Sequence, residues 1–220
     1  LADNILLKVC SKIMDPVTTT DELIPSGETS SYRSNPLRLA EFTLSRKDPE
    51  YVGRAKAVLA LEKNREAGEA TGDEVASVYG ALKASGLTVD PANTVIASTI
   101  YANKPGDGSA REQAASCQRV LGAGANLAME YATKRYRSNC INWGMLPFMV
   151  KSADVVENGD WVFVPGIRKV LLEGGEETTA YAVHEGKVTS FPVSLGHLTG
   201  PERQILADGC LINYYQHSQQ

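Results

Sequence analysis

Residues 94–102, TVIASTIYA, restrict the fold of this chain more than any other segment. The run is apolar and rich in β-branched residues, and it shows no alternation of polar with apolar side chains. Such a run is typical of a strand that is covered on both faces, because a strand with one solvated face alternates. The sequence therefore predicts a sheet with helices packed on its faces.

The neighbouring segments extend this pattern. Helical spacing of apolar residues, stop signals at glycine and short apolar runs predict alternating strands and helices up to about residue 150, and mainly strands after it. We expect an α/β fold, a swivelling β/β/α domain with a mixed sheet flanked by helices. The predicted strands are 5–9, 94–102, 125–132, 145–150, 160–166, 168–173 and 179–185, and the predicted helices are 48–68, 73–86, 109–123, 134–144 and 200–215. A long surface loop is expected over 17–36, which is rich in Thr, Ser, Gly and Pro.

Size and charge limit the class of protein. With 220 residues, of which 43% are hydrophobic, the chain is expected to form one domain over residues 1–220 of a longer protein. A net charge of -4 argues against nucleic acid as a partner, since neutralising phosphates needs excess Lys and Arg. No run reaches the roughly 18 apolar residues of a membrane span. We therefore expect no membrane partner and a cytoplasmic location.

Cysteine and histidine spacing gives no sign of a metal site. The cysteines lie far apart without a C-x-x-C pair, and we expect buried thiols rather than metal or cluster ligands. The histidines all fall in the last quarter of the chain, which disfavours a Ser-His pair near the motif described next. These residues are Cys10, Cys117, Cys140 and Cys210, and His184, His197 and His217.

The stretch PGDGSAREQAA, residues 105–115, has two interpretations. Ser109 and Glu112 have the spacing of a capping box, which contributes about 1 kcal/mol to a helix. Alternatively, glycines that permit close backbone approach, a helix N-terminus and Arg111 create a field that stabilises an anion, in which Ser109 could act as a base.

Other motifs are weaker. Gly122 and Gly124 start a partial G-x-G-x-x-G, but Leu127 occupies the third glycine position and a strand follows. No G-K-[ST] ending accompanies GDGSARE, so a phosphate loop is not supported. KRYRSN, residues 134–139, is expected to be the solvated face of a helix.

Four stretches, in order, carry a family resemblance: TTTDELIPSG, YRSNP, GDGSARE and NCINWGMLPF. Together they resemble successive motifs of the swivelling C-terminal domain of aconitases and related hydro-lyases, the aconitase/isopropylmalate isomerase superfamily. The resemblance covers about residues 5 to 150, and the end of the chain is also similar.

The resemblance implies roles for particular residues. Ser109 would be the catalytic base for the α-proton of the substrate, and Asp21 would orient a catalytic group from another domain. Arg33 and Arg111 would bind substrate carboxylates. Gly108, within the turn formed by 106–108, and Ala110 would line the substrate beside Ser109.

Two positions depart from the family pattern. Glu22 stands where the family has histidine, and Ala110 replaces the second serine of G-S-S-R-E. A missing hydroxyl near a developing oxyanion can cost several kcal/mol of transition-state stabilisation. We therefore expect a divergent hydratase rather than a housekeeping aconitase.

The family also implies a cofactor and partners. A 4Fe-4S iron-sulfur cluster would come from cluster-bearing domains of the same protein or from a large subunit, because this chain shows no cluster ligands. The expected activity is reversible dehydration of a citrate- or isocitrate-like hydroxy polycarboxylate in the complete enzyme. The alternatives are a non-catalytic carboxylate-binding or sensing domain, and the small subunit of an isopropylmalate- or homoaconitate-type isomerase. An RNA-binding role, also found among aconitases, has little support in this acidic chain.

Overall fold

The computed structural model describes residues 1–25, 35–109 and 111–209, and a mixed seven-stranded sheet closed into a barrel forms its centre. The strand order is β1-β3-β5-β6-β9-β8-β7. Neighbours among β1, β3, β5 and β6 are parallel, whereas β7, β8 and β9 join by antiparallel pairs. The strands are β1 (Asn4–Ile13), β3 (Thr94–Ala102), β5 (Ala123–Ala128), β6 (Leu146–Met149), β7 (Trp161–Val164), β8 (Glu177–His184) and β9 (Lys187–Ser194).

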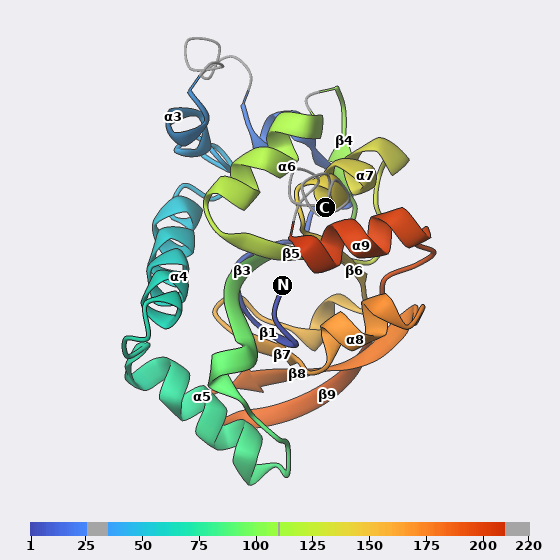
Figure 1. Cartoon of the computed structure of the whole chain (residues 1–220). Coiled ribbons are helices and arrows are strands. Elements are labelled where there is room, and N and C mark those ends of the chain that lie inside the picture. Colours follow the sequence, from blue (N-terminus) through green and yellow to red (C-terminus); the bar gives the residue numbers. More distant parts are fainter. Residues whose placement is uncertain (26–34, 110, 210–220) are drawn as a thin grey trace.

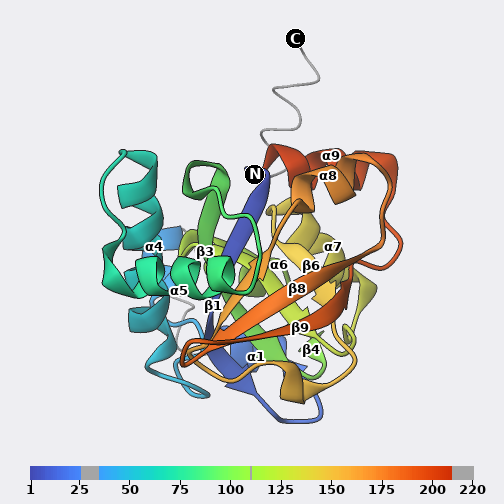
Figure 2. The same cartoon turned by 90° about the horizontal axis from the view of Figure 1, so that it is seen from below.

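Helices surround this sheet, as expected. Figure 1 shows α6 and α7 at the end of the molecule opposite β8 and β9, with α4 and α5 along one side. In the view of Figure 2, α8 and α9 lie beside each other near the start of β1. The helices are α1 (Thr20–Leu23), α3 (Pro36–Ala40), α4 (Tyr51–Glu66), α5 (Gly72–Ala84), α6 (Arg111–Val120), α7 (Lys134–Asn142), α8 (Ile167–Leu172) and α9 (Gly200–Asp208), with short 3-10 turns at Pro91–Asn93 and Ala153–Val155.

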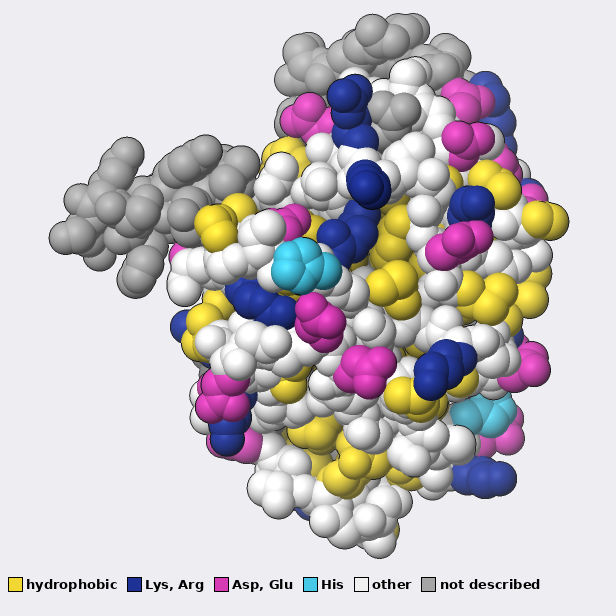
Figure 3. Space-filling model, turned by 90° about the vertical axis from the view of Figure 1, so that its right-hand side faces the viewer, with side chains coloured by type: hydrophobic (Ala, Val, Ile, Leu, Met, Phe, Trp, Pro, Cys, Tyr) yellow, Lys and Arg dark blue, Asp and Glu magenta, His cyan; other side chains and the backbone are white. Residues whose placement is uncertain are grey.

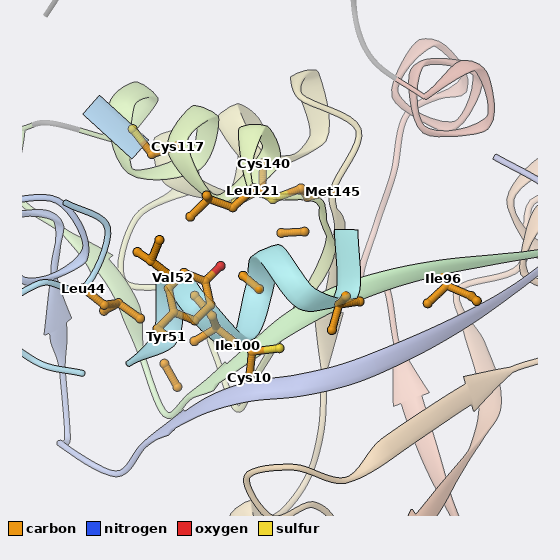
Figure 4. Close-up of a cluster of buried hydrophobic side chains, with 14 of the residues drawn as sticks. Cys10, Leu44, Tyr51, Val52, Ile96, Ile100, Cys117, Leu121, Cys140 and Met145 are labelled. Carbon is orange, nitrogen blue, oxygen red and sulfur yellow. The ribbon is translucent and has the colours of Figure 1, made fainter. Parts of the chain in front are cut away.

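The prediction of a doubly covered strand is confirmed. β3 has the predicted bounds, and its side chains divide between two apolar clusters, one on each face of the sheet. Ile96 and Ile100 join the cluster beneath the helices, while Ala97 and Tyr101 join the other. Figure 4 shows Ile100 near Tyr51 of α4, between the helices and the sheet. Both faces of β3 are therefore buried.

The prediction for residues 168–173 is wrong. They belong to the helix α8 rather than to a strand, with Ile167 and Leu171 buried one helical turn apart. Gly166, with φ +66°, is the N-cap residue directly before the helix. β8 instead pairs antiparallel with β7 on one side and on the other with β9, a strand that the sequence did not predict and that follows a two-residue turn with positive φ at Glu185 and Gly186.

The long loop expected over 17–36 also contains regular structure. The two-residue strand β2 (Thr18–Thr19) and the helix α1 lie inside it. Residues 26–34 of the expected loop lie outside the described residues. The shortness of β2 and α1 explains why apolar periodicity gave no sign of them.

The cysteines behave as expected where they are described. Cys10, Cys117 and Cys140 are free and buried, and burial raises the pKa of their thiols, to about 11 for the first two and about 12 for Cys140. Cys210 lies outside the described residues. Among the helices that the structure describes, none combines the length and apolar composition of a membrane span.

A histidine-aspartate pair ties the entry of β7 to the end of β8. Nδ1 of His184 contacts Oδ1 of Asp160, whose other oxygen accepts a hydrogen bond from the amide of Glu157 at 2.8 Å. The Asp160 side chain is 5% exposed, and its hydrogen bond and charge raise the pKa of His184 above 6.5. Glu157 and Glu185 act in the same direction.

This pair predicts a pH-dependent contribution to stability. Because the folded pKa of His184 is raised, the contribution is complete below about pH 6.5 and is lost as the pH rises through the folded pKa. We expect His184→Gln to lower the urea midpoint most at about pH 5.5, and progressively less towards about pH 9. The control is His197→Gln, at an exposed histidine 3.4 Å from Glu176. A loss for His184→Gln that does not change with pH would contradict the prediction.

Candidate functional site

Two motif segments far apart in the sequence meet in a small parallel sheet. β2 pairs with β4 (Pro105–Asp107), with Thr18 opposite Pro105 and Thr19 opposite Asp107. Asp21 and Ser109 each lie two residues beyond the second pair, on segments that run in the same direction. Both residues are exposed. The fold therefore brings the candidate base and the candidate orienting carboxylate to the same edge.

The turn ahead of Ser109 requires glycine at two positions. Gly106 has φ +101°, and a Cβ there would lie 2.3 Å from the ring of Tyr136. Gly108 has φ +116°, and a Cβ there would lie 2.5 Å from Oγ1 of Thr20. Close approach and left-handed backbone thus both exclude larger residues. Since β4 and this turn carry Ser109 into solvent, the chain holds the serine on a tightly packed support.

The start of α6 does not support the capping interpretation of Ser109. α6 begins at Arg111, one residue later than a capping box of Ser109 with Glu112 requires. Helix boundaries vary by a residue or two, and both interpretations of Ser109 stay predictions.

Of the other predicted site residues, only some lie in the part of the chain that the structure describes. Arg111 is the first residue of α6, directly after the turn. Arg33 and Ala110 lie outside the described residues. Asp21 lies in α1, where one carboxylate oxygen is 3.5 Å from Nη1 of Arg46 with both side chains half-exposed.

Glu22, the departure from the family pattern, has a structural role in α1. Its carboxylate accepts hydrogen bonds from the amide of Thr19 at 3.2 Å and from the hydroxyl of Thr19 at 3.1 Å, completing a capping box. Oε2 of Glu22 also lies 3.2 Å from Nζ of Lys47. The extra negative charge is therefore compensated locally, and Glu22 fixes the start of the helix that carries Asp21.

Behind the turn lies a buried polar network that sequence reasoning missed. The hydroxyl of Tyr136 accepts hydrogen bonds from Nε2 of Gln118 at 2.9 Å and Nδ2 of Asn126 at 3.0 Å. All three side chains are buried, and burial raises the pKa of Tyr136 well above its usual value, so the phenol stays protonated. The network joins α6, β5 and α7. No local sequence signal marks it, since Tyr136 stands between two cationic residues.

The basic helix is amphipathic rather than a basic surface patch. Lys134 and Arg135 are exposed as expected, but Tyr136 is buried and Arg137 donates to the carbonyl oxygens of Leu195 and His197 at 2.8 and 2.9 Å. On the face shown in Figure 3, acidic and basic side chains of the described residues are interspersed with apolar ones.

Metal-ligating side chains are not gathered in the part of the chain that the structure describes. No group of three or more His, Cys, Asp or Glu there could hold a metal ion. Thiolates are the usual cluster ligands, and Cys10, Cys117 and Cys140 are buried in the apolar core without joining such a group. The described residues therefore do not fit an iron-sulfur cluster.

The Tyr136 network predicts a specific loss of stability. Tyr136→Phe keeps the ring against Gly106 but leaves Gln118 and Asn126 without their shared acceptor, which should cost about 1–3 kcal/mol of unfolding free energy. Urea unfolding measures the change. The control is Tyr51→Phe, because the equally buried hydroxyl of Tyr51 interacts with the side chain of Ser98 and, among the described residues, accepts from no pair of buried amides. Equal effects of the two substitutions would refute a special role for the network.

Comparisons with known proteins agree with this architecture. Residues 60–153, which contain Ser109, match the family "Aconitase C-terminal domain". The matched range begins after Asp21 and Arg33, so it is shorter than the range of about 5–150 over which the motifs extend. No curated protein sequence matches the chain.

A solved structure extends the likeness over the whole chain. The crystal structure of 3-isopropylmalate dehydratase (leuD) from Methanocaldococcus jannaschii is similar with a TM-score of 0.57 and 20% sequence identity, covering 98% of this chain and 95% of that one. At this identity the match concerns the fold. The resemblance drawn from the motifs is thus confirmed over residues 60–153, which match the aconitase C-terminal domain, and the whole chain has the fold of the 3-isopropylmalate dehydratase structure.

Proposed function

We propose that this chain is the swivelling domain or small subunit of an aconitase-like hydro-lyase, with Ser109 as the base of the dehydration. The observation that carries the proposal is the parallel pairing of β2 with β4, which delivers the segments of Asp21 and Ser109 to one edge. The family match over residues 60–153 supports the same class of reaction.

In this proposal, Oγ of Ser109 takes the α-proton of a hydroxy polycarboxylate and returns it in the reverse direction. The N-terminus of α6, which follows the turn, stabilises negative charge on the serine oxygen. Arg33 and Arg111 hold substrate carboxylates with their planar guanidinium groups. Asp21 orients a group that the partner contributes.

In this proposal the partner supplies the iron-sulfur cluster, for which the described residues of this chain offer no site. An iron-sulfur cluster on other domains or on a large subunit would act as Lewis acid towards the leaving hydroxyl. Base and Lewis acid would then lie on separate bodies, and closure of the two would exclude water from the site. The chain by itself would be inactive.

Both lines of comparison support one proposed substrate class. The motifs resemble those of citrate- and isocitrate-converting enzymes, whereas the similar solved structure is a 3-isopropylmalate dehydratase. We propose a 2- or 3-hydroxy polycarboxylate, with alkyl-substituted malates included. A panel of citrate, isocitrate, homocitrate and 3-isopropylmalate, offered to the complete assembly, separates these substrates by kcat/KM.

The assignment of the base predicts the effect of one substitution. Ser109→Ala in the complete assembly should lower kcat by about 10²–10⁴-fold, because a positioned base is lost, while KM changes little. Steady-state turnover measures both constants. Near-unchanged kcat would remove Ser109 from the mechanism.

A non-catalytic carboxylate-binding role gives a different pattern. Titration calorimetry of the chain alone would then show citrate binding, and no assembly or substrate in the panel would turn over. The departures at Glu22 and Ala110 are the features that favour this alternative.

A further inference from the structure

The turn at 105–109 is held from one side by the segment that starts α7. The amide of Ala132 donates to the carbonyl oxygen of Pro105 at 2.9 Å. The hydroxyl of Thr133 donates to the carbonyl oxygen of Gly106 at 3.1 Å. Two successive residues of one segment thus hydrogen-bond to two successive residues of the other.

Thr133 also determines where α7 begins. Its hydroxyl oxygen, the N-cap of the helix, accepts a hydrogen bond from the amide of Tyr136 at 3.1 Å. One hydroxyl therefore links the first turn of α7 to the backbone of the turn that precedes Ser109. A small displacement of α7 would move the turn with it.

Tyr136 completes the support. Its ring fills the space where Gly106 would carry a side chain, and its hydroxyl is fixed by Gln118 from α6 and Asn126 from β5. α6 is the helix that directly follows Ser109. The segments before and after the serine are therefore anchored to the same tyrosine.

From the other side, Thr20 of α1 limits the turn. Thr20 is buried, and its Oγ1 occupies the position that a Cβ on Gly108 would need. The turn thus lies between α1 and α7, with its glycines facing Thr20 and Tyr136.

We propose that Thr133 and Tyr136 are positioning residues for Ser109, which hold its turn in the geometry that proton transfer requires. The inference rests on the proposed function, because it assigns these residues to the reaction of Ser109. Proton transfer is sensitive to displacements of about 1 Å, and so a fixed turn affects kcat more than binding.

The structural half of the proposal is tested without activity. Amide hydrogen exchange is measured by mass spectrometry on the full chain carrying Thr133→Val, Thr133→Ser or Thr199→Val. We expect Thr133→Val to speed exchange in the 105–109 segment about fivefold, as loss of the one hydrogen bond to the carbonyl of Gly106 predicts, and Thr133→Ser to restore both hydrogen bonds of the hydroxyl. Thr199→Val is the matched control, since Thr199 caps α9 through the same kind of bond, at 3.2 Å to the amide of Glu202, and has no such bond to the turn. Unchanged exchange at 105–109 in Thr133→Val would overturn the proposal.

The catalytic half is tested in the complete assembly. Thr133→Val should lower kcat about tenfold with KM nearly unchanged, Thr133→Ser should recover most of the rate, and Thr199→Val should resemble the unaltered protein. In a Ser109→Ala background, Thr133→Val should have no further effect on the residual rate, because the group that it positions is gone.

The outcomes separate the two proposals. If Ser109→Ala abolishes turnover while Thr133→Val leaves kcat unchanged, the positioning role is wrong and the base is retained. If Ser109→Ala leaves turnover intact, the proposed function fails. The hydrogen-exchange result then still decides whether Thr133 fixes the turn.

Discussion

The parallel pairing of β1 with β3 is the constraint on which the rest of the structure depends. Its register runs from Asn4 opposite Thr94 to Ile13 opposite Ala102, so the two longest strands of the parallel part end at the same level. Asn103, just after β3, donates to the carbonyl oxygens of Met14 and Asp15 at 2.9 and 3.2 Å and ties the two exits together. β2 and β4 can pair only because the segments that follow β1 and β3 leave the sheet side by side.

The sheet was predictable because it rests on patterns that span many residues. β3 has the expected bounds, and the helices α4, α5, α6 and α7 all appear where apolar spacing and terminal glycines indicated. A nine-residue apolar strand and a 16-residue helix each present enough repeats for their period to be recognised. Errors arose at the short helix α8 and at β9, an eight-residue strand that was not predicted. α8 has only six residues, and its apolar side chains suit a strand equally well.

The sequence proposed the residues of the candidate site but not their geometry. Gly106, Gly108 and Ser109 were recognised because a turn before a helix leaves a local signature. Tyr136 could not be found, since its relation to Gly106 arises from two segments separated by β5. Glu22 shows the reverse case. Its departure from the family suggested altered chemistry, yet the capping box with Thr19 gives the residue a sufficient structural reason.

Closure of the barrel has a consequence for how this protein can associate. Each of the seven strands has a neighbour on both sides, although β6 and β9 meet at only one pair, Met149 opposite Ser194. An apolar strand such as β3 would invite intermolecular strand addition if its backbone were open. With β1 on one side and β5 on the other, β3 is closed to that mode of recognition, whereas β9 has only the single pair with β6 on its second side among the described residues. A second body that approaches the parallel strands must therefore be recognised through loops and side chains, and such surfaces can separate and meet again without breaking a sheet.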